Sequence, residues 1–441
     1  MNLTIEEIIS ATNAKVIKKK NDDIKLSVST DSRNIGENQL YLPLKGDRFD
    51  GHDFIQGALE KGARGYLTAN PDLIFSEADY ILAVDDTREA YLQIARAYKR
   101  KVDPVTIAIT GSSGKTTTKE MMYSIACERF KTHKSILNHN NEIGLCETLT
   151  KMPEDTQVLI VEMGMRGLGE IELLSKYSEP DIAILANVGS AHIGRLGSMD
   201  NIAIAKCEIT KYLHKEGYFY AHDDELIKKH NKFDGFTKYF GLNSKNLSVK
   251  ELTPSGSTFE FKKQTYRVNL EGEHNIQNAL GAILAGLKLG IPSSVIAEGL
   301  AKFKPIEKRW EVEKIGGLKI INDSYNANPE SVKAALKTFL SLYKNPKVIV
   351  LGNMGELGKD EKKYHSEIGA FLENYKYDYL ITVGDLAKFI KTKTKTNFKH
   401  FDNNIDAAKF INKKVKLGSN VLLKASRSMK FEEIIEELKK L

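Results

Sequence analysis

Short apolar runs alternate with amphipathic stretches along most of the chain. Residues 105–109, 158–161 and 182–185 are nearly continuous apolar runs, the pattern of strands that are buried on both faces. Polar residues and glycines follow these runs, and segments with apolar residues at helical spacing lie between them. Residues 348–351 and 421–423 repeat the pattern in the C-terminal third. This alternation predicts an α/β fold whose sheets are largely parallel.

The length of 441 residues predicts three domains, at roughly 150 residues per domain. We place a small N-terminal α/β domain over residues 1–102, ending at Asp103-Pro104. Residues 103–308 then form a central domain with a parallel sheet of the phosphate-loop type. Residues 309–441 form a C-terminal, Rossmann-like domain with a small doubly wound sheet.

The composition, 41% hydrophobic and 28% charged residues, is typical of soluble globular proteins. Cys127, Cys146 and Cys207 show neither disulfide-scaffold nor metal-site spacing, which favours a reducing compartment. No apolar run approaches the roughly 20 residues that span a bilayer, and no apolar signal segment follows Met1. We therefore expect a cytoplasmic protein without membrane insertion.

The net charge of +7 comes from dispersed lysines. We interpret the densest run, residues 18–20, as a solvated turn. A basic balance can indicate nucleic-acid binding, but basic and aromatic residues are not interleaved here. Anionic nucleotide substrates explain a mild positive charge equally well, so we expect no nucleic-acid partner.

The strongest chemical signal follows the first apolar run. A glycine turn with Gly111 and Gly114 separates that predicted strand from a helix-compatible segment. Strand, glycine turn and helix together direct backbone N–H groups and a helix N-terminus at a phosphate. Lys115 would then reach the terminal phosphates, and the Thr116 hydroxyl would meet a magnesium ion. The full G-x-x-x-x-G-K-[ST] motif is not present, because Ile109 stands where its first glycine would.

This shortened loop resembles that of the Mur ligase and folylpolyglutamate synthase superfamily, whose members activate a carboxylate with ATP and join it to an amine. The resemblance implies ATP as a substrate and Lys115 as a catalytic residue. It assigns the whole loop to ATP: Thr110, Gly111, Ser112, Ser113, Gly114, Lys115, Thr116 and Thr117.

Two further strand ends carry candidate metal ligands. Glu162 follows residues 158–161, and a carboxylate there suits magnesium, although the position alone fits a surface carboxylate equally well. Glu162-Met-Gly and Asn187-x-Gly-x-x-His192 match the family pattern in order. The resemblance implies that Thr116, Glu162 and His192 bind two Mg²⁺ ions and that His192 is catalytic.

Lys206 lies in a segment with helical periodicity, where a lysine is usually solvated. The family has a lysine in this Ala-Lys-x-Glu context, and in many members carbon dioxide carbamylates it. That reaction needs a neutral amine, which burial favours. The resemblance therefore implies that Lys206 is catalytic and, as a carbamate, a metal ligand.

Other ATP contacts are implied further along the chain. Asn275 and Asn278 lie at i, i+3 on one predicted helix face, where either side chain could also cap the helix. Their His-Asn-x-x-Asn pattern resembles the adenine contact of the family. Arg309 matches a hinge arginine of the family, and Asp323 ends a predicted strand that faces the nucleotide.

The N-terminal domain contains loops that fit a phosphate, a sugar or simply solvent. Asp31-Ser-Arg and Asp50-Gly-His resemble the uridine-nucleotide-binding domain of the family, which implies that a UDP moiety lies against this domain. Asn140 and Asn141 resemble residues that line the muramoyl-peptide site. The implied substrate residues are Ser32, Arg33, Gly46, Asp50, His52, Asn140 and Asn141.

The segment from Asp323 to Pro329 is the most specific signal after the phosphate loop. Because a residue before proline avoids helix, we expect the helix to begin at Pro329. The segment is similar to that of the family branch that adds D-alanyl-D-alanine to UDP-N-acetylmuramoyl-tripeptide. The resemblance implies substrate contacts from Tyr325, Asn326 and Asn328.

We therefore expect an ATP-dependent ligase whose reaction passes through an acyl phosphate intermediate. We also expect the protein to be a monomer. A folylpolyglutamate synthase would share the phosphate loop but not the segments around Arg33, His52 and Tyr325. A regulator or a nucleic-acid motor would bind ATP without amide synthesis, and a motor would need a basic groove that the sequence does not indicate.

Overall fold

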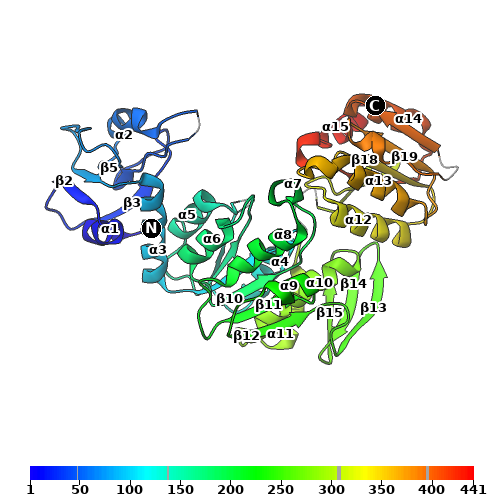
Figure 1. Ribbon diagram of the computed structural model, residues 1–441, viewed down its shortest axis with the longest axis horizontal. Helices are drawn as coiled ribbons and strands as arrows, with labels where there is room; N and C mark the ends of the chain where they lie inside the picture. The colour runs from blue at the N-terminus through cyan, green and yellow to red at the C-terminus, as the bar shows by residue number, and fades with distance from the viewer. Residues whose placement is uncertain (47, 137–138, 305–308, 394–396) are drawn as a thin grey trace.

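The chain folds into three α/β bodies in a row, the first blue, the second cyan to yellow-green and the third yellow to red (Figure 1). The computed structural model describes residues 1–46, 48–136, 139–304, 309–393 and 397–441. The three bodies confirm the predicted fold class. The predicted boundary after residue 308 lies outside the described residues.

The N-terminal domain has one mixed sheet with three helices and a short 3-10 turn: β1 (Leu3–Thr4), α1 (Ile5–Thr12), β2 (Lys15–Lys19), β3 (Lys25–Ser29), β4 (Gln39–Tyr41), η1 (Gly51–Phe54), α2 (Ile55–Glu60), β5 (Gly65–Thr68), β6 (Tyr80–Ala83) and α3 (Thr87–Val102). The strand order is β1-β3-β4-β5-β6-β2. The four middle strands run parallel, and the two edge strands pair antiparallel to their neighbours.

The lysine-rich run is part of an edge strand, so its interpretation as a solvated turn was wrong. Lys18 and Lys19 belong to β2, which lies beside β6 at the end of the sheet. Lys19 forms an ion pair with Glu6 of α1. Lysines on an edge strand oppose pairing with another chain, which gives the run a structural purpose.

The central domain has a parallel sheet, a small antiparallel sheet and the helices around them: β7 (Val105–Thr110), α4 (Lys115–Ala126), β8 (Thr132–Lys134), α5 (Glu142–Thr150), β9 (Val158–Glu162), α6 (Glu170–Ser178), β10 (Ile182–Leu185), α7 (Ile193–Leu196), α8 (Met199–Cys207), η2 (Glu208–Thr210), β11 (Tyr218–His222), α9 (Glu225–His230), β12 (Phe236–Phe240), β13 (Leu247–Thr253), β14 (Gly256–Phe261), β15 (Gln264–Val268), α10 (Glu273–Lys288) and α11 (Ser293–Lys302).

Alternate residues of the central strands pack on opposite layers of helices. Ile107 and Ile109 of β7 belong to the core that α4, α10 and α11 complete, whereas Ala108 belongs to the core on the other face, beneath α5, α6 and α8. The parallel order is β12-β11-β10-β7-β9-β8. The segments that follow β10, β7 and β9 therefore meet at one edge of the sheet.

The C-terminal domain is a second doubly wound sheet: β16 (Glu311–Ile315), β17 (Leu318–Asn322), α12 (Pro329–Leu342), β18 (Lys347–Gly352), η3 (Gly358–Asp360), α13 (Glu361–Leu372), β19 (Tyr379–Val383), η4 (Ala387–Phe389), β20 (Asn397–Phe401), α14 (Asn404–Lys414), β21 (Asn420–Lys424), η5 (Arg427–Met429) and α15 (Glu432–Lys440). Its order is β16-β17-β21-β18-β19-β20, with only β16 antiparallel. Helix α12 begins at Pro329, as predicted, with Asn328 as its N-cap.

Helix α3 joins the first two domains. Its buried residues belong to one apolar core with residues of α1 and with Leu145 and Leu149 of α5. Arg96 and Arg100 of α3 both form ion pairs with Glu179, which follows α6. The N-terminal domain is thereby fixed to the central one through a shared helix.

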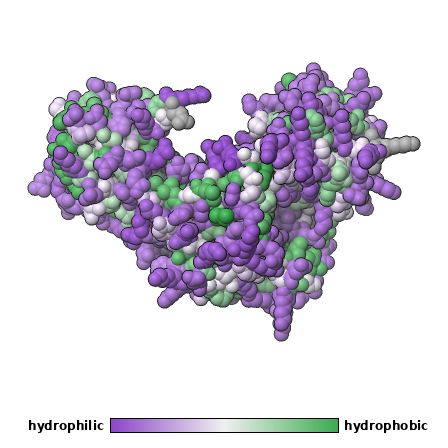
Figure 2. Space-filling model, viewed as in Figure 1, coloured by the Kyte–Doolittle hydropathy of each residue, from purple (hydrophilic) through white to green (hydrophobic). Residues whose placement is uncertain are grey.

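An open cleft separates the N-terminal domain from the C-terminal domain above the central one (Figure 2). In the described part of the chain, no helix combines the length and the apolar character needed to cross a bilayer.

Candidate active site

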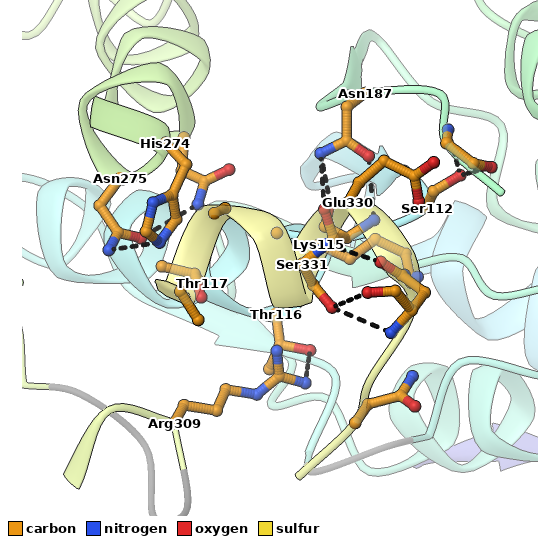
Figure 3. Close-up of a pocket in the computed structure, with 18 of the residues that line it drawn as sticks. Ser112, Lys115, Thr116, Thr117, Asn187, His274, Asn275, Arg309, Glu330 and Ser331 are labelled. Carbon is orange, nitrogen blue, oxygen red and sulfur yellow. Dashed lines mark hydrogen bonds between the residues drawn. The ribbon is translucent and has the colours of Figure 1, made fainter. Parts of the chain in front are cut away.

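The predicted phosphate loop lies between β7 and α4 (Figure 3). Helix α4 begins directly after Gly114, whose φ of 77° lies in the left-handed region that favours glycine. A β-carbon at Gly114 would come within 2.3 Å of Asn278 Oδ1 on α10. Glycine is therefore required here for both the turn and the close approach of α10.

The segment that follows β10 holds the loop in shape. Asn187 Oδ1 accepts a hydrogen bond from the Ser113 N–H at 2.9 Å, and Asn187 Nδ2 donates to Ser113 O and Oγ, each at 3.0 Å. The Ser112 hydroxyl accepts from the Gly189 N–H at 2.8 Å and donates to the Gly189 carbonyl at 2.9 Å. The loop is thus preorganised by hydrogen bonds before any ligand arrives.

Lys115 and Thr116 begin α4 and meet charged groups from other segments. Lys115 Nζ donates to the Gly111 carbonyl oxygen at 2.7 Å. Burial lowers the pKa of Lys115 from its ordinary value, and Glu162 opposes that shift. The Thr116 hydroxyl donates to Glu162 Oε1 at 3.1 Å and accepts from Arg309 Nη2 at 3.0 Å. A phosphate in this loop would meet Lys115, Arg309 and the positive end of α4.

Glu162 fits the chemistry of a magnesium ligand. Its Oε1 accepts hydrogen bonds from Thr116 and, at 3.2 Å, from Asn140 Nδ2. Its buried Oε2 accepts no hydrogen bond from the described residues and lies 3.5 Å from Lys119 Nζ. A buried carboxylate oxygen without a hydrogen-bond donor, beside a threonine hydroxyl, suits a hard cation.

His192 turns toward the C-terminal domain. Its Nδ1 forms an ion pair with the carboxylate of Glu356, which follows β18. No three histidine, cysteine, aspartate or glutamate side chains gather as a metal-binding group in the described ranges. The structure brings Thr116 and Glu162 together, while His192 is held by Glu356.

Lys206 lies in α8, as its periodicity predicts, but it is buried rather than solvated, at 1% exposure. Burial lowers the pKa of Lys206 well below its ordinary value, and the nearby charge of Lys115 lowers it further. Both effects favour the neutral amine, which is the form that reacts with carbon dioxide.

Asn275 and Asn278 line the cavity from α10 and do not cap the helix, whose N-cap is Gly272. Asn278 Nδ2 donates to Asn275 Oδ1 at 3.2 Å, and Asn275 Nδ2 donates to the Glu271 carbonyl at 2.8 Å. Burial lowers the pKa of His274, which precedes Asn275, to about 4, so this ring is neutral near neutral pH.

The C-terminal domain contributes the opposite wall. Asp323, which follows β17, forms an ion pair at 2.7 Å with Lys424, which ends the neighbouring β21. The Tyr325 ring stacks beneath the Arg309 guanidinium, 4.3 Å from the ring centroid. Asn328 Oδ1 accepts from the Ser331 N–H at 2.8 Å, so this predicted substrate residue also has a structural role as a helix cap.

These walls enclose a cavity of about 340 Å³ between the central and C-terminal domains. That volume lies within the range of small-molecule sites. The predicted site residues that line it are Ser112, Ser113, Gly114, Lys115, Thr116, Thr117, Asn275, Asn278, Arg309, Asp323, Tyr325, Asn326 and Asn328. Among the predicted catalytic, ATP and metal residues, those outside its lining are Thr110, Gly111, Glu162, His192 and Lys206.

Several cavity residues were missed by the sequence analysis as site residues: Asn187, His274, Trp310, Glu330 and Lys424. An amide at the end of a strand beside a phosphate loop was the available signal for Asn187. The His-Asn-x-x-Asn pattern, whose first residue is His274, was the available signal for that residue. Trp310, Glu330 and Lys424 depend on strand order and on the contact between domains, which the sequence does not display.

The predicted uridine-site residues lie in the N-terminal domain, across the open cleft. Arg33 is exposed and forms an ion pair at 2.9 Å with Asp31. His52 uses both ring nitrogens within its own domain: Nδ1 lies 2.6 Å from Asp50 Oδ1, and Nε2 accepts from the Ala69 N–H at 3.1 Å. His52 and Asp50 therefore stabilise the fold of the loop. Arg33 is more accessible than His52 to an anionic ligand, because its side chain is exposed.

The remaining predicted substrate residues occupy turns. Ser32 lies near the buried Tyr41, whose hydroxyl donates to the Gly51 carbonyl at 3.1 Å, and the Gly46 N–H donates to the Phe49 carbonyl at 3.0 Å. Asn141 caps α5 by accepting from the Gly144 N–H at 3.0 Å. Asn140 is the one of this group that connects to the phosphate-loop region, through Glu162.

A buried carboxylate at the domain junction gives a pH-dependent stability. Burial raises the pKa of Glu271 to about 7, although a hydrogen bond from the Tyr343 hydroxyl at 3.1 Å and the charge of Lys319 oppose the shift. Because the folded-state pKa is raised, this contribution to stability is complete below about pH 4.5 and is lost as the pH rises through 7.

We expect Glu271→Gln to weaken the alkaline loss of stability. Between pH 5 and pH 8.5 the wild type should lose about 2 kcal/mol of unfolding free energy that the variant retains. Urea unfolding at several pH values measures this difference. Glu298→Gln, on the exposed face of α11, is the control and should keep the wild-type profile. Identical profiles for wild type and Glu271→Gln would contradict the prediction.

Three family descriptions match successive parts of the chain. Residues 27–100 match "Mur ligase family, catalytic domain", residues 109–286 match "Mur ligase middle domain", and residues 308–427 match "Mur ligase, glutamate ligase domain". Together they cover the three structural domains in order.

Proteins of known name resemble the chain along its length. It is 39% identical over 428 residues to the UDP-N-acetylmuramoyl-tripeptide–D-alanyl-D-alanine ligase of Bacillus subtilis, covering 93% of this chain and 92% of that protein. A crystal structure of MurF from Acinetobacter baumannii superimposes with a TM-score of 0.92 at 29% identity, covering 100% of this chain and 99% of the other. The crystal structure of MurF ligase from Thermotoga maritima in complex with ADP superimposes with a TM-score of 0.85 at 30% identity, covering 94% of this chain and 97% of the other.

Proposed function

The chain belongs to the Mur ligase family, and we propose that it joins D-alanyl-D-alanine to UDP-N-acetylmuramoyl-tripeptide while converting ATP to ADP and phosphate. The observation that carries this proposal is the cavity that joins the phosphate loop to the 323–328 segment of the C-terminal domain. One wall suits a nucleotide, and the other carries the segment that resembles the D-alanyl-D-alanine-adding branch.

The proposed reaction has two chemical steps. The terminal carboxylate of the tripeptide attacks the γ-phosphorus of ATP, the bond to the β–γ bridging oxygen breaks, and an acyl phosphate and ADP result. The amine of D-alanyl-D-alanine then attacks the acyl carbon, and the tetrahedral intermediate expels phosphate and loses a proton. Stabilising the negative charge on the phosphoryl oxygens is the main catalytic requirement.

The chain supplies three positive elements for that charge. The N-terminus of α4 borders the cavity, with the side chain of Lys115 beside it. Arg309 reaches Thr116 from the start of the C-terminal domain and stacks on Tyr325. Because this wall comes from another domain, the contact also shields the site from water, which would hydrolyse an acyl phosphate.

Magnesium ions belong to the proposal as well. Thr116 and Glu162 would hold one ion, and its Lewis acidity would withdraw charge from the phosphoryl oxygens. His192 would join them on release from Glu356. Lys206 is the proposed carbamate, because its burial lowers the pKa of the amine and favours the neutral form.

The N-terminal domain is the proposed holder of the UDP end of the substrate. Its candidate cation Arg33 is exposed, and the cleft between the outer domains leaves room for an extended molecule (Figure 2). In this arrangement the peptide would run from the uridine site past Asn140 toward Glu162. The monomeric state and the cytoplasmic location stay predictions.

Phosphate release from ATP tests the proposed function directly. We expect release that requires both UDP-N-acetylmuramoyl-tripeptide and D-alanyl-D-alanine, measured with each omitted in turn and with single amino acids as alternative amines. Release with a single amino acid and a shorter peptide precursor would assign the chain to another ligation step. No release with any pair would contradict amide ligation altogether.

A further inference from the structure

One short segment touches both the phosphate loop and the C-terminal domain. It comprises residues 187–194, which include most of the connection from β10 to α7 and the first two residues of α7, and we call it the relay segment. On one side Asn187 and Gly189 hold Ser113 and Ser112 by the hydrogen bonds described above. Both contacts are direct, so a displacement of the relay segment must displace the loop.

On its other side, two carboxylates of the C-terminal domain hold the same segment. Glu330, in the first turn of α12, accepts a hydrogen bond from the Ser190 hydroxyl at 2.9 Å. Its carboxylate also packs on Gly189, where an added β-carbon would lie 3.1 Å from Glu330 Oε2. Figure 3 shows Glu330 close to both Asn187 and Ser112.

Glu356, the second carboxylate, contacts the C-terminal end of the relay segment. The Gly194 N–H donates to the Glu356 carbonyl at 3.1 Å, and the Glu356 carboxylate pairs with His192. A β-carbon on Gly194 would lie 2.4 Å from the backbone nitrogen of Gly358. The two domains are therefore in backbone contact here, and the relay segment is held at both ends.

From these contacts we propose that Glu330 is a positioning residue, which acts through Ser190 and the relay segment to keep the phosphate loop in its nucleotide-binding shape. When the C-terminal domain is seated, Glu330 fixes Ser190 and Gly189, and these fix Ser112 and Ser113. The helix that follows the proposed D-alanyl-D-alanine segment is thereby coupled to the nucleotide. This inference rests on the proposed function only in assuming that the loop binds a nucleotide.

The coupling follows from the chemistry of the contact. Ser190 is buried, at 2% exposure, and its hydroxyl needs an acceptor, whereas Glu330 borders the cavity. Removing either partner frees the relay segment from α12 without changing a group that would touch the phosphates. A glutamine at 330 keeps an acceptor oxygen for Ser190, so it should preserve the coupling although it removes the charge.

Titration calorimetry with magnesium ADP measures the effect without requiring turnover. We expect Glu330→Ala and Ser190→Ala each to weaken ADP binding about fivefold, with the double variant no weaker than either single one. Glu330→Gln should bind within about twofold of the wild type. Affinity for the UDP-linked substrate, which the N-terminal domain would hold, should not change.

A matched control separates this relay from general tethering of the domains. Lys337 of α12 forms an ion pair at 2.6 Å with Glu273 of α10, away from the relay segment. Lys337→Ala thus removes another contact between α12 and the central domain, and it should leave ADP affinity unchanged.

Three results would overturn the inference. The first is unchanged ADP affinity in both Glu330→Ala and Ser190→Ala. The second is a double variant whose loss of ADP affinity equals the product of the two single losses. The third is a loss of ADP affinity in Lys337→Ala as large as that in Glu330→Ala. Wild-type protein that fails to bind magnesium ADP would overturn the proposed function as well. Melting temperatures near the wild-type value establish that the variants are folded.

Discussion

Replacing Lys115 with alanine is expected to reduce substrate-dependent phosphate release by about a hundredfold or more, while the protein remains folded. Lys115 is the cation within the phosphate loop, and Arg309 reaches the same place only from the other domain. Without its ammonium group, the phosphoryl oxygens would lose a charge-assisted partner that no neighbouring side chain can replace.

The loss should appear mainly in the rate at saturating ATP. Lys115 bonds to the Gly111 carbonyl in the absence of a ligand, so the loop shape depends less on it than on Asn187. Phosphate release at saturating substrates and the melting temperature are the two measurements. Lys302→Ala, at the exposed end of α11, is the control and should behave as wild type. Normal turnover in Lys115→Ala would refute the assignment of the phosphate loop.

The phosphate loop and the start of α12 were predictable because local chemistry determines them. A buried strand, a glycine with positive φ and a helix N-terminus lie within a few residues around Gly114, and the structure confirms all three. Pro329 similarly limits where α12 can begin, and Asn328 supplies the cap. In such stretches the sequence pattern and the final structure are governed by the same short-range sterics.

The contacts that complete the site were not predictable in this way. Lys424 meets Asp323 because β21 lies beside β17, although about a hundred residues separate them in the chain. His192 was expected at the metal, but it contacts Glu356 from another domain. Strand order and domain docking arise from long-range packing, so no local pattern around these residues could reveal their partners.

Lys206→Ala should lower phosphate release about a hundredfold, and short carboxylic acids such as acetate or propionate should restore part of it. Lys206 is buried, and its lowered pKa favours the neutral amine, which is the form that adds carbon dioxide to give a carbamate and a proton. Removing the side chain leaves a space where a small carboxylate can supply the same negative oxygens. The assay compares both variants, Lys206→Ala and Lys115→Ala, with and without added acids.

Lys115→Ala is the matched control for this rescue, because an anion cannot replace a lost cation beside phosphates. A second measurement concerns the wild type. In buffer freed of carbon dioxide its activity should fall and return with bicarbonate, whereas Lys206→Ala should not respond to bicarbonate. If Lys206 acts only as an ammonium group or through its packing, added carboxylates will not restore the activity of Lys206→Ala, and bicarbonate will not change the activity of the wild type. Full activity in Lys206→Ala would likewise exclude the carbamate, so the experiment separates a modified lysine from a merely buried one.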